Sequence, residues 1–155
     1  MVTDLFGAIL QELSHSLKIE NLSPDSNNSC LLRLESGLII QLEFDRRGEF
    51  LVLGADLGTT PPGKYRENLF KEALKSNDLP HPNHGILCYS NKSDHLVLYE
   101  KIHLKDLNGE KIAAEITPFA EKAYKWSEAL LRNEIPAVNQ AFTSHKPGGM
   151  FGLIR

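Results

Sequence analysis

A glycine-rich stretch that ends in a lysine is the first candidate for chemistry in this sequence. The stretch Gly58-Thr59-Thr60-Pro61-Pro62-Gly63-Lys64 fits the G-x-x-x-x-G-K pattern of a phosphate-binding loop. Such a loop holds phosphate with consecutive backbone N–H groups, and Pro61 and Pro62 remove two of them. Tyr65 also stands where a serine or threonine should bind magnesium. The sequence therefore argues against a nucleotide site here.

Paired histidines and two cysteines are the remaining candidates. His81 and His84 form a His-x-x-His pair, but no cysteine or carboxylate cluster adjoins them to complete a zinc site. Cys30 and Cys88 lie in separate apolar runs, which favours buried free thiols, with a disulfide as the alternative. No Gly-x-Ser-x-Gly elbow occurs. We therefore expect no catalytic residue, metal or cofactor, and we predict that the protein is not an enzyme.

Composition and charge exclude further classes of function. The chain has 155 residues, 41% of them hydrophobic, which is enough for one folded domain with one core. The net charge is -3 and basic residues form no run, so we expect no nucleic-acid partner. The apolar N-terminus lacks a basic region before it, and no apolar run is long enough to cross a bilayer. We predict a cytoplasmic protein without membrane insertion.

The periodicity of apolar residues predicts the elements that would position any site. Apolar residues recur at three- and four-residue steps in three segments and alternate in five others. The result is an α+β fold in the order α-β-β-β-α-β-β-α, with three helices on an antiparallel twisted sheet of about five strands. The expected helices cover about residues 3–18, 65–77 and 108–131, and the expected strands lie at 30–35, 38–44, from 50 onward, 86–90 and 95–104.

Two features of the C-terminal half leave alternatives open. Pro118 lies inside the last helical pattern, so we expect it either to kink that helix or to begin a new one with Thr117 as its cap. Periodicity fails after about Pro136. We therefore expect a single domain over residues 1–134, followed by a flexible tail over residues 135–155.

The predicted sheet carries more apolar side chains than one buried face requires. Leu31 and Ile39 lie opposite the faces that we assign to the core, and the strand from Phe50 is apolar on both sides. One explanation is that helices pack on both faces of the sheet. The other, which we favour, is that some apolar strand surface remains available for a partner.

The element order, together with three local patterns, resembles a known family. The patterns are the segment Leu53-Gly54-Ala55-Asp56-Leu57-Gly58, the helix that ends Leu69-Phe70-Lys71-Glu72-Ala73-Leu74-Lys75-Ser76-Asn77, and Leu96-Val97-Leu98-Tyr99 leading to the helix of Trp126. Over about residues 3–133 the chain resembles the class I type III secretion chaperones, the CesT/SycE-like or Tir chaperone family. The resemblance implies a cytoplasmic homodimer without ATPase activity. Such a chaperone binds the N-terminal chaperone-binding segment of secreted effectors, keeps it extended, and presents it to the secretion ATPase.

The resemblance also implies two sets of site residues. For each set, packing within a single subunit is the alternative interpretation. The alternative to a chaperone is a small-ligand-binding or sensory α+β domain, which would use an apolar pocket between the sheet and a helix. The expected effector-binding residues lie on the first helix and the outer strand positions: Leu5, Phe6, Ile9, Leu13, Leu31, Ile39, Leu51 and Leu53. The expected dimer-interface residues lie on the central helix and the following strand: Tyr65, Leu69, Phe70, Leu74, Ile86 and Cys88.

Overall fold

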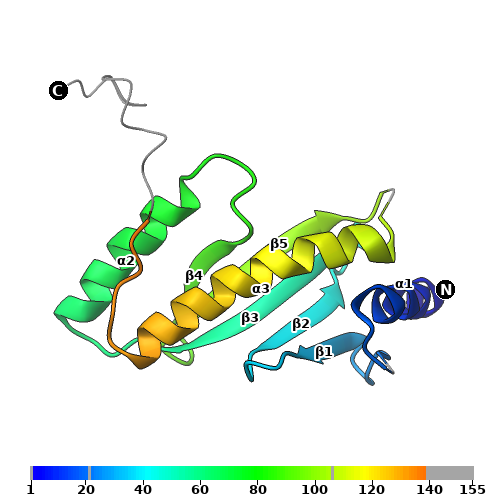
Figure 1. Ribbon diagram of the computed structural model, residues 1–155, viewed down its shortest axis with the longest axis horizontal. Helices are drawn as coiled ribbons and strands as arrows, with labels where there is room; N and C mark the ends of the chain where they lie inside the picture. The colour runs from blue at the N-terminus through cyan, green and yellow to red at the C-terminus, as the bar shows by residue number, and fades with distance from the viewer. Residues whose placement is uncertain (1, 21, 106, 139–155) are drawn as a thin grey trace.

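The computed structural model describes residues 2–20, 22–105 and 107–138. Within these residues, three helices lie against one face of a single five-stranded antiparallel sheet, in the predicted order α-β-β-β-α-β-β-α. The longest helix, α3 (Gly109–Leu131), runs lengthwise along the sheet (Figure 1). The helices α1 (Val2–Leu17) and α2 (Lys64–Asn77) lie at opposite ends of it.

The sheet is a meander of three strands with a hairpin added to its last strand. The strands are β1 (Ser29–Arg33), β2 (Ile39–Phe44), β3 (Phe50–Thr59), β4 (Ile86–Ser90) and β5 (His95–His103). Their spatial order is β1-β2-β3-β5-β4, so the hairpin places β5 beside the central strand β3 and leaves β4 at an edge. The first three strands therefore pair antiparallel with their neighbours in sequence order, as an antiparallel sheet requires.

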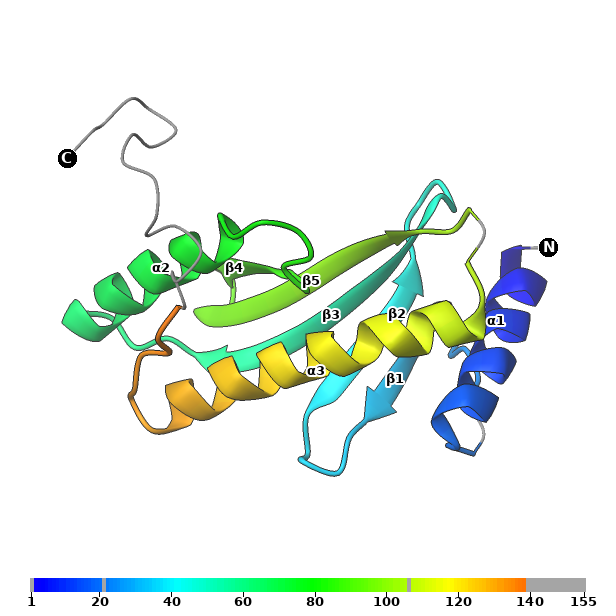
Figure 2. The same cartoon turned by 45° about the horizontal axis from the view of Figure 1, so that its top comes forward.

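The helix α1 presents one apolar stripe to the core. Phe6, Ile9, Leu10 and Leu13 recur at helical spacing and are all buried. The Phe6 ring packs on Phe44 of β2, with 4.7 Å between the ring centroids. These contacts fix α1 over the end of the sheet beside the N-terminal half of α3, where Figure 2 shows it.

The helix α3 is continuous through its proline. Asn108 caps its N-terminus, because the Asn108 side chain accepts a hydrogen bond of 2.9 Å from the Lys111 backbone N–H. Pro118 lies inside the helix and does not split it. Thr117 is consequently no cap, and its hydroxyl instead donates to the Ala113 carbonyl at 3.4 Å.

Register decides which strand residues enter the core. On β3, Leu51 and Leu53 pair with Ile102 and Glu100 of β5, and both leucines are fully buried beneath the helices. The prediction that these two leucines occupy outer positions was therefore wrong. The buried strand residues on the same face are Cys30, Leu32, Ile40, Leu42, Ala55, Leu87, Leu96 and Leu98.

The opposite face of the sheet carries no helix among the described residues. Leu31 is 57% exposed on this face, and Ile39 and Tyr99 are each 36% exposed. Cys88 is also exposed, because its partner in the register is Val97 on the outer face. The prediction of a buried thiol holds for Cys30 and is wrong for Cys88. The favoured explanation for the surplus of apolar strand residues, an uncovered face, matches this arrangement.

The chain after α3 returns along the domain before the described residues end. Tyr65 of α2 donates a hydrogen bond of 2.9 Å to the Glu134 carbonyl, which holds this return against α2. Pro136 is buried and Val138 packs against the core. Most of the predicted flexible tail, residues 139–155, lies outside the described residues, and the boundary after residue 134 stays a prediction.

Candidate binding groove

A groove opens where two neighbouring strands separate. The pairing of β2 with β3 ends at Gln41 and Gly54, whereas the pairing of β3 with β5 continues to Thr59 and His95. The edge of β3 from Ala55 onward therefore has no strand partner on the β2 side within the described chain. In Figures 1 and 2, β2 and β3 lie together near the turn that joins them and diverge toward their other ends.

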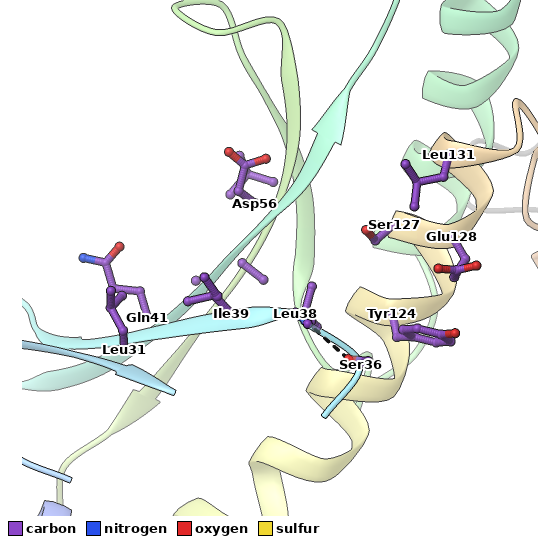
Figure 3. A pocket seen from close by; sticks show the side chains of 14 residues that line it. Leu31, Ser36, Leu38, Ile39, Gln41, Asp56, Tyr124, Ser127, Glu128 and Leu131 are labelled. Atoms are coloured by element: carbon purple, nitrogen blue, oxygen red, sulfur yellow. Dashed lines mark hydrogen bonds between the residues drawn. The ribbon is translucent and has the colours of Figure 1, made fainter. Parts of the chain in front are cut away.

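The walls of this groove are mainly apolar and come from three parts of the fold. We call it the β2–β3 groove, and its volume is about 610 Å³. Figure 3 shows β2 and β3 on one side and the C-terminal half of α3 on the other. The lining residues are Leu31, Ser36, Gly37, Leu38, Ile39, Gln41, Gly54, Ala55, Asp56, Val97, Tyr124, Ser127, Glu128 and Leu131.

A local irregularity in β3 shapes the floor of the groove. The register of β3 against β5 shifts between Asp56 and Gly58, which places an extra residue in β3. Gly58 has a φ of 124°, a backbone conformation that favours glycine. Its N–H donates a hydrogen bond of 3.0 Å to the carboxylate of Asp56, which lines the groove.

Two of the predicted effector-binding residues line the groove, and most of the others are in the core. Leu31 and Ile39 lie on its strand wall. Leu5 is 52% exposed on α1 but does not line the groove. The predicted residues that the structure buries within the subunit, and that offer no surface in this arrangement, are Phe6, Ile9, Leu13, Leu51 and Leu53.

The predicted dimer-interface residues also differ in their exposure. Leu69 is fully buried on the inner side of α2 and belongs to the core, so the structure contradicts a place for it on an interface. Leu74 is 69% exposed on the outer side of α2. The remaining four are exposed or half-buried: Tyr65 and Phe70 on α2, and Ile86 and Cys88 on β4.

Sequence patterns missed the helix wall of the groove. Tyr124 is 46% exposed and Leu131 is 76% exposed, and neither was among the expected binding residues. Leu130 and Leu131 are adjacent apolar residues at the end of the helix, and only the true rotation of α3 buries the first and exposes the second. Tyr124 and Leu131 each directly follow a buried residue, Ala123 and Leu130, so the sequence alone gives little signal for this wall.

A second concave surface lies between the α2–β4 loop and α3. It encloses about 740 Å³ and is lined by His81, Pro82, Lys122, Trp126 and Val138 among others. Lys122 donates hydrogen bonds of 2.8 Å to the carbonyls of Asn83 and Gly85, which satisfies its ammonium group within the subunit. No group of three or more potential metal ligands occurs in the described part of the chain, so the two histidines of the loop stand without further ligands there.

Neither cysteine has the environment of a reactive thiolate. Burial raises the pKa of the Cys30 thiol, and the nearby Asp25 carboxylate raises it further. Burial likewise raises the pKa of Cys88. Both groups are therefore protonated thiols at neutral pH, which is unfavourable for nucleophilic chemistry.

Comparison with known proteins identifies a protein family whose model matches most of this chain. A model of the Tir chaperone protein (CesT) family matches residues 8–127. No match was found among curated proteins. None of the described helices is long and apolar enough to span a membrane.

Solved structures with the same fold include several secretion chaperone complexes. A chain in the HopA1–SchA chaperone–effector complex superimposes with a TM-score of 0.68 at 23% identity, covering 83% of this chain and 98% of that chain. A chain in the structure of the Yersinia pestis type III secretion chaperone SycH, in complex with a fragment of YscM2, gives a TM-score of 0.62 at 16% identity, covering 77% and 97%. A chain in the ExoU–SpcU complex from the type III secretion system of Pseudomonas aeruginosa gives 0.57 at 15% identity, covering 83% and 99%.

The family model spans most of the described domain, from α1 to the C-terminal half of α3. The fold of the similar structures agrees with it over nearly their whole length. The chain belongs to the Tir chaperone protein (CesT) family.

Proposed function

We propose that this protein is a type III secretion chaperone that holds an extended segment of a secreted effector in the β2–β3 groove. The observation that carries the site is the unpaired edge of β3 beside exposed apolar side chains. An extended peptide can pair its backbone with such an edge and place alternate side chains in neighbouring apolar pockets. Leu31 and Ile39 on one wall, and Tyr124 and Leu131 on the other, would receive those side chains.

The energetics favour a segment with several apolar residues. Ordering a flexible segment costs free energy, which the contacts must exceed. Fully burying one large aliphatic side chain contributes about 1.5–3 kcal/mol, so two or three such side chains are needed. A segment held in this way cannot fold on itself, which matches the task of keeping an effector ready for export. In this function the protein works in the cytoplasm, without enzymatic activity, and delivers its client to the secretion ATPase.

Capture from the native host tests the proposed function. Tagged wild-type chain, an Ile39→Glu variant and a Leu5→Glu variant are used in parallel to pull proteins from the host cytoplasm, which mass spectrometry then identifies. We expect the wild type and Leu5→Glu to retain secreted proteins through their N-terminal segments. We expect Ile39→Glu to lose them, because a carboxylate would be forced into an apolar contact.

Leu5 is a suitable matched control because it is exposed and apolar but lies outside the groove. Equal circular dichroism spectra and melting temperatures for the three proteins would establish that folding is intact. Capture lost in Leu5→Glu and kept in Ile39→Glu would move the binding surface to α1. A small molecule in native mass spectra, with no captured polypeptide, would instead favour a ligand-binding domain.

We also propose that two copies associate through the end of the molecule formed by α2 and β4. An edge strand exposes unpaired backbone groups, and β4 is the edge strand at this end of the sheet. Leu74 on α2 and Cys88 on β4 are both exposed near it. A two-fold axis would bring each of these residues against the same surface of the second copy. The β2–β3 groove lies beyond the opposite edge of β3, so both sites can be occupied together.

A further inference from the structure

The charged side chains that line the β2–β3 groove are all negative. Two of its fourteen lining residues, Asp56 and Glu128, are acidic, and none is basic. They stand on facing walls, since Asp56 belongs to β3 and Glu128 to α3 (Figure 3). Both are set among apolar side chains that a client would cover. A client with a purely apolar or acidic segment would therefore cover these carboxylates without bringing a cation to them.

The Asp56 carboxylate is held in place before any client arrives. Both of its oxygens lie 2.8 Å from Nδ1 of His95, and one of them accepts the hydrogen bond from the Gly58 N–H. The His95 ring is fixed in turn by Thr59, whose hydroxyl oxygen lies 3.2 Å from its Nε2. The Asp56 side chain nevertheless stays 60% exposed, so a ligand in the groove can still reach its carboxylate.

The Glu128 carboxylate is arranged in a comparable way on the helix. It lies 3.3 Å from the Arg132 guanidinium, one helical turn further on, and is 31% exposed. Arg132 is itself 66% exposed and does not line the groove. The arginine therefore limits the rotamers of Glu128 from the solvent side and leaves the groove side without a cation.

The geometry of an added strand determines where a client charge would lie. Successive side chains of an extended segment point to opposite faces. A segment along the β3 edge would direct alternate side chains toward Ile39 and Asp56 on the sheet side, and the intervening ones toward Leu131 and Glu128 on the helix side. A cationic side chain flanking an apolar one can thus reach either carboxylate without leaving the strand.

We propose that the clients of this groove are extended segments in which a lysine or arginine flanks the apolar anchor residues, with Asp56 and Glu128 as the residues that select for this charge. The inference rests on the proposed function, because it specifies the chemistry of the segment that the groove holds. Neutralising both carboxylates should weaken binding of a basic client about tenfold, as expected for charge-assisted hydrogen bonds in a partly desolvated site.

Peptide selection provides a test that needs no known client. Random twelve-residue peptides displayed on phage are selected on the full-length chain, and the dissociation constants of enriched peptides are measured by fluorescence polarisation. The measurements are repeated with the double variant Asp56→Asn/Glu128→Gln, with Ile39→Glu, and with Glu20→Gln, which changes an exposed carboxylate outside the groove. Asparagine retains an oxygen for the Gly58 N–H, so the bulge should persist in the variant.

Three outcomes are distinguishable. Enriched peptides with Lys or Arg beside apolar residues, weakened about tenfold by the double variant and by added salt but not by Glu20→Gln, would support the inference. Peptides that lose binding in Ile39→Glu but show no basic preference would overturn the inference and leave the proposed function standing. If no enriched peptide depends on Ile39, both the inference and the groove as client site are wrong.

Discussion

A buried carboxylate beneath α3 should make the stability of the fold depend on pH in the neutral range. Glu100 of β5 pairs with Leu53 and so points toward the helix layer. Its Oε2 atom is buried without a hydrogen-bond partner. Burial, and to a lesser extent the Glu115 carboxylate, raise the pKa of Glu100 to about 7, although the Lys122 ammonium acts to lower it. The same burial lowers the pKa of Lys122 to about 8.

The sign of the effect follows from linkage. The pKa of Glu100 is higher in the folded chain than its usual value of 4.5, so below pH 4.5 the group is protonated in both states and costs nothing. As the pH rises from 4.5 to 7, the unfolded chain ionises freely while the folded chain retains its proton. The free energy of unfolding therefore falls across this window and stays lower above it. A pKa difference of about 2.5 corresponds to about 3 kcal/mol, which partial solvent screening reduces to about 2 kcal/mol.

The substitution Glu100→Gln should remove this dependence. We expect wild type and variant to have similar stability at pH 5, and the variant to be more stable by about 2 kcal/mol at pH 7.5. Urea unfolding at one fixed protein concentration measures the difference. The fluorescence of Trp126 reports it, because this is the single tryptophan of the chain and it is 3% exposed. The lowered pKa of Lys122 makes the free energy of unfolding rise with pH only above about pH 8, so in the wild type this group adds little pH dependence between pH 5 and 7.5.

A second variant tests why the pKa of Glu100 is raised. Glu115→Gln removes the repulsion that raises the Glu100 pKa, so the loss of stability between pH 5 and 7.5 should become smaller but not disappear. If wild type and Glu100→Gln instead lose equal stability between these two pH values, the Glu100 carboxylate is as well solvated in the folded state as in the unfolded chain. The assignment of Glu100 to a desolvated position between β5 and α3 would then be wrong.

Two further substitutions test the subunit contact and the helix packing. Leu74→Asp should shift the chain from dimer to monomer in sedimentation equilibrium while leaving its helix content unchanged, and a dimer that persists at the same concentration would place the interface elsewhere. Gly109→Ala should destabilise the fold by about 1–3 kcal/mol in the same urea assay, because a Cβ there would lie 2.5 Å from the backbone of Glu12 on α1. Unchanged stability in Gly109→Ala would mean that α1 and α3 separate at little cost.

Element order was predictable from this sequence because each element carries its own periodicity. The stripe that includes Phe6 and Leu13 fixed α1, and the alternation around Ile40 fixed β2, before any tertiary contact was known. Asn108 was also recognisable as the start of α3, since a side-chain cap is a local interaction. Pro118 was ambiguous, because a proline within a helix is decided by its packing environment and not by its neighbours in sequence.

The orientation of β3 could not be predicted from its own residues. Both faces of the strand are apolar, so alternation gives no preference, and only pairing with β5 places Leu51 and Leu53 inward. Cys88 was misassigned for the same reason. Leu31 and Ile39 were found correctly as outward residues because polar Arg33 and Gln41 share their face. A strand with one polar side can be oriented from sequence, whereas a strand that is apolar on both sides cannot.

The groove itself depends on a tertiary feature with only a faint trace in the sequence. The pairing of β2 with β3 ends at Gly54. The bulge between Asp56 and Gly58 follows directly, in the part of β3 that has no partner on the β2 side. A bulge increases local twist, which carries the end of β3 away from the β1–β2 hairpin. Closing the gap with a longer β2 would pair the β3 edge internally and bury Ile39. We therefore interpret the short β2 and the glycine at position 58 as the features that keep one strand position vacant. A client that fills this position completes the sheet, so occupancy should protect the backbone amides at the β3 edge from hydrogen exchange more than those of the exposed helix wall.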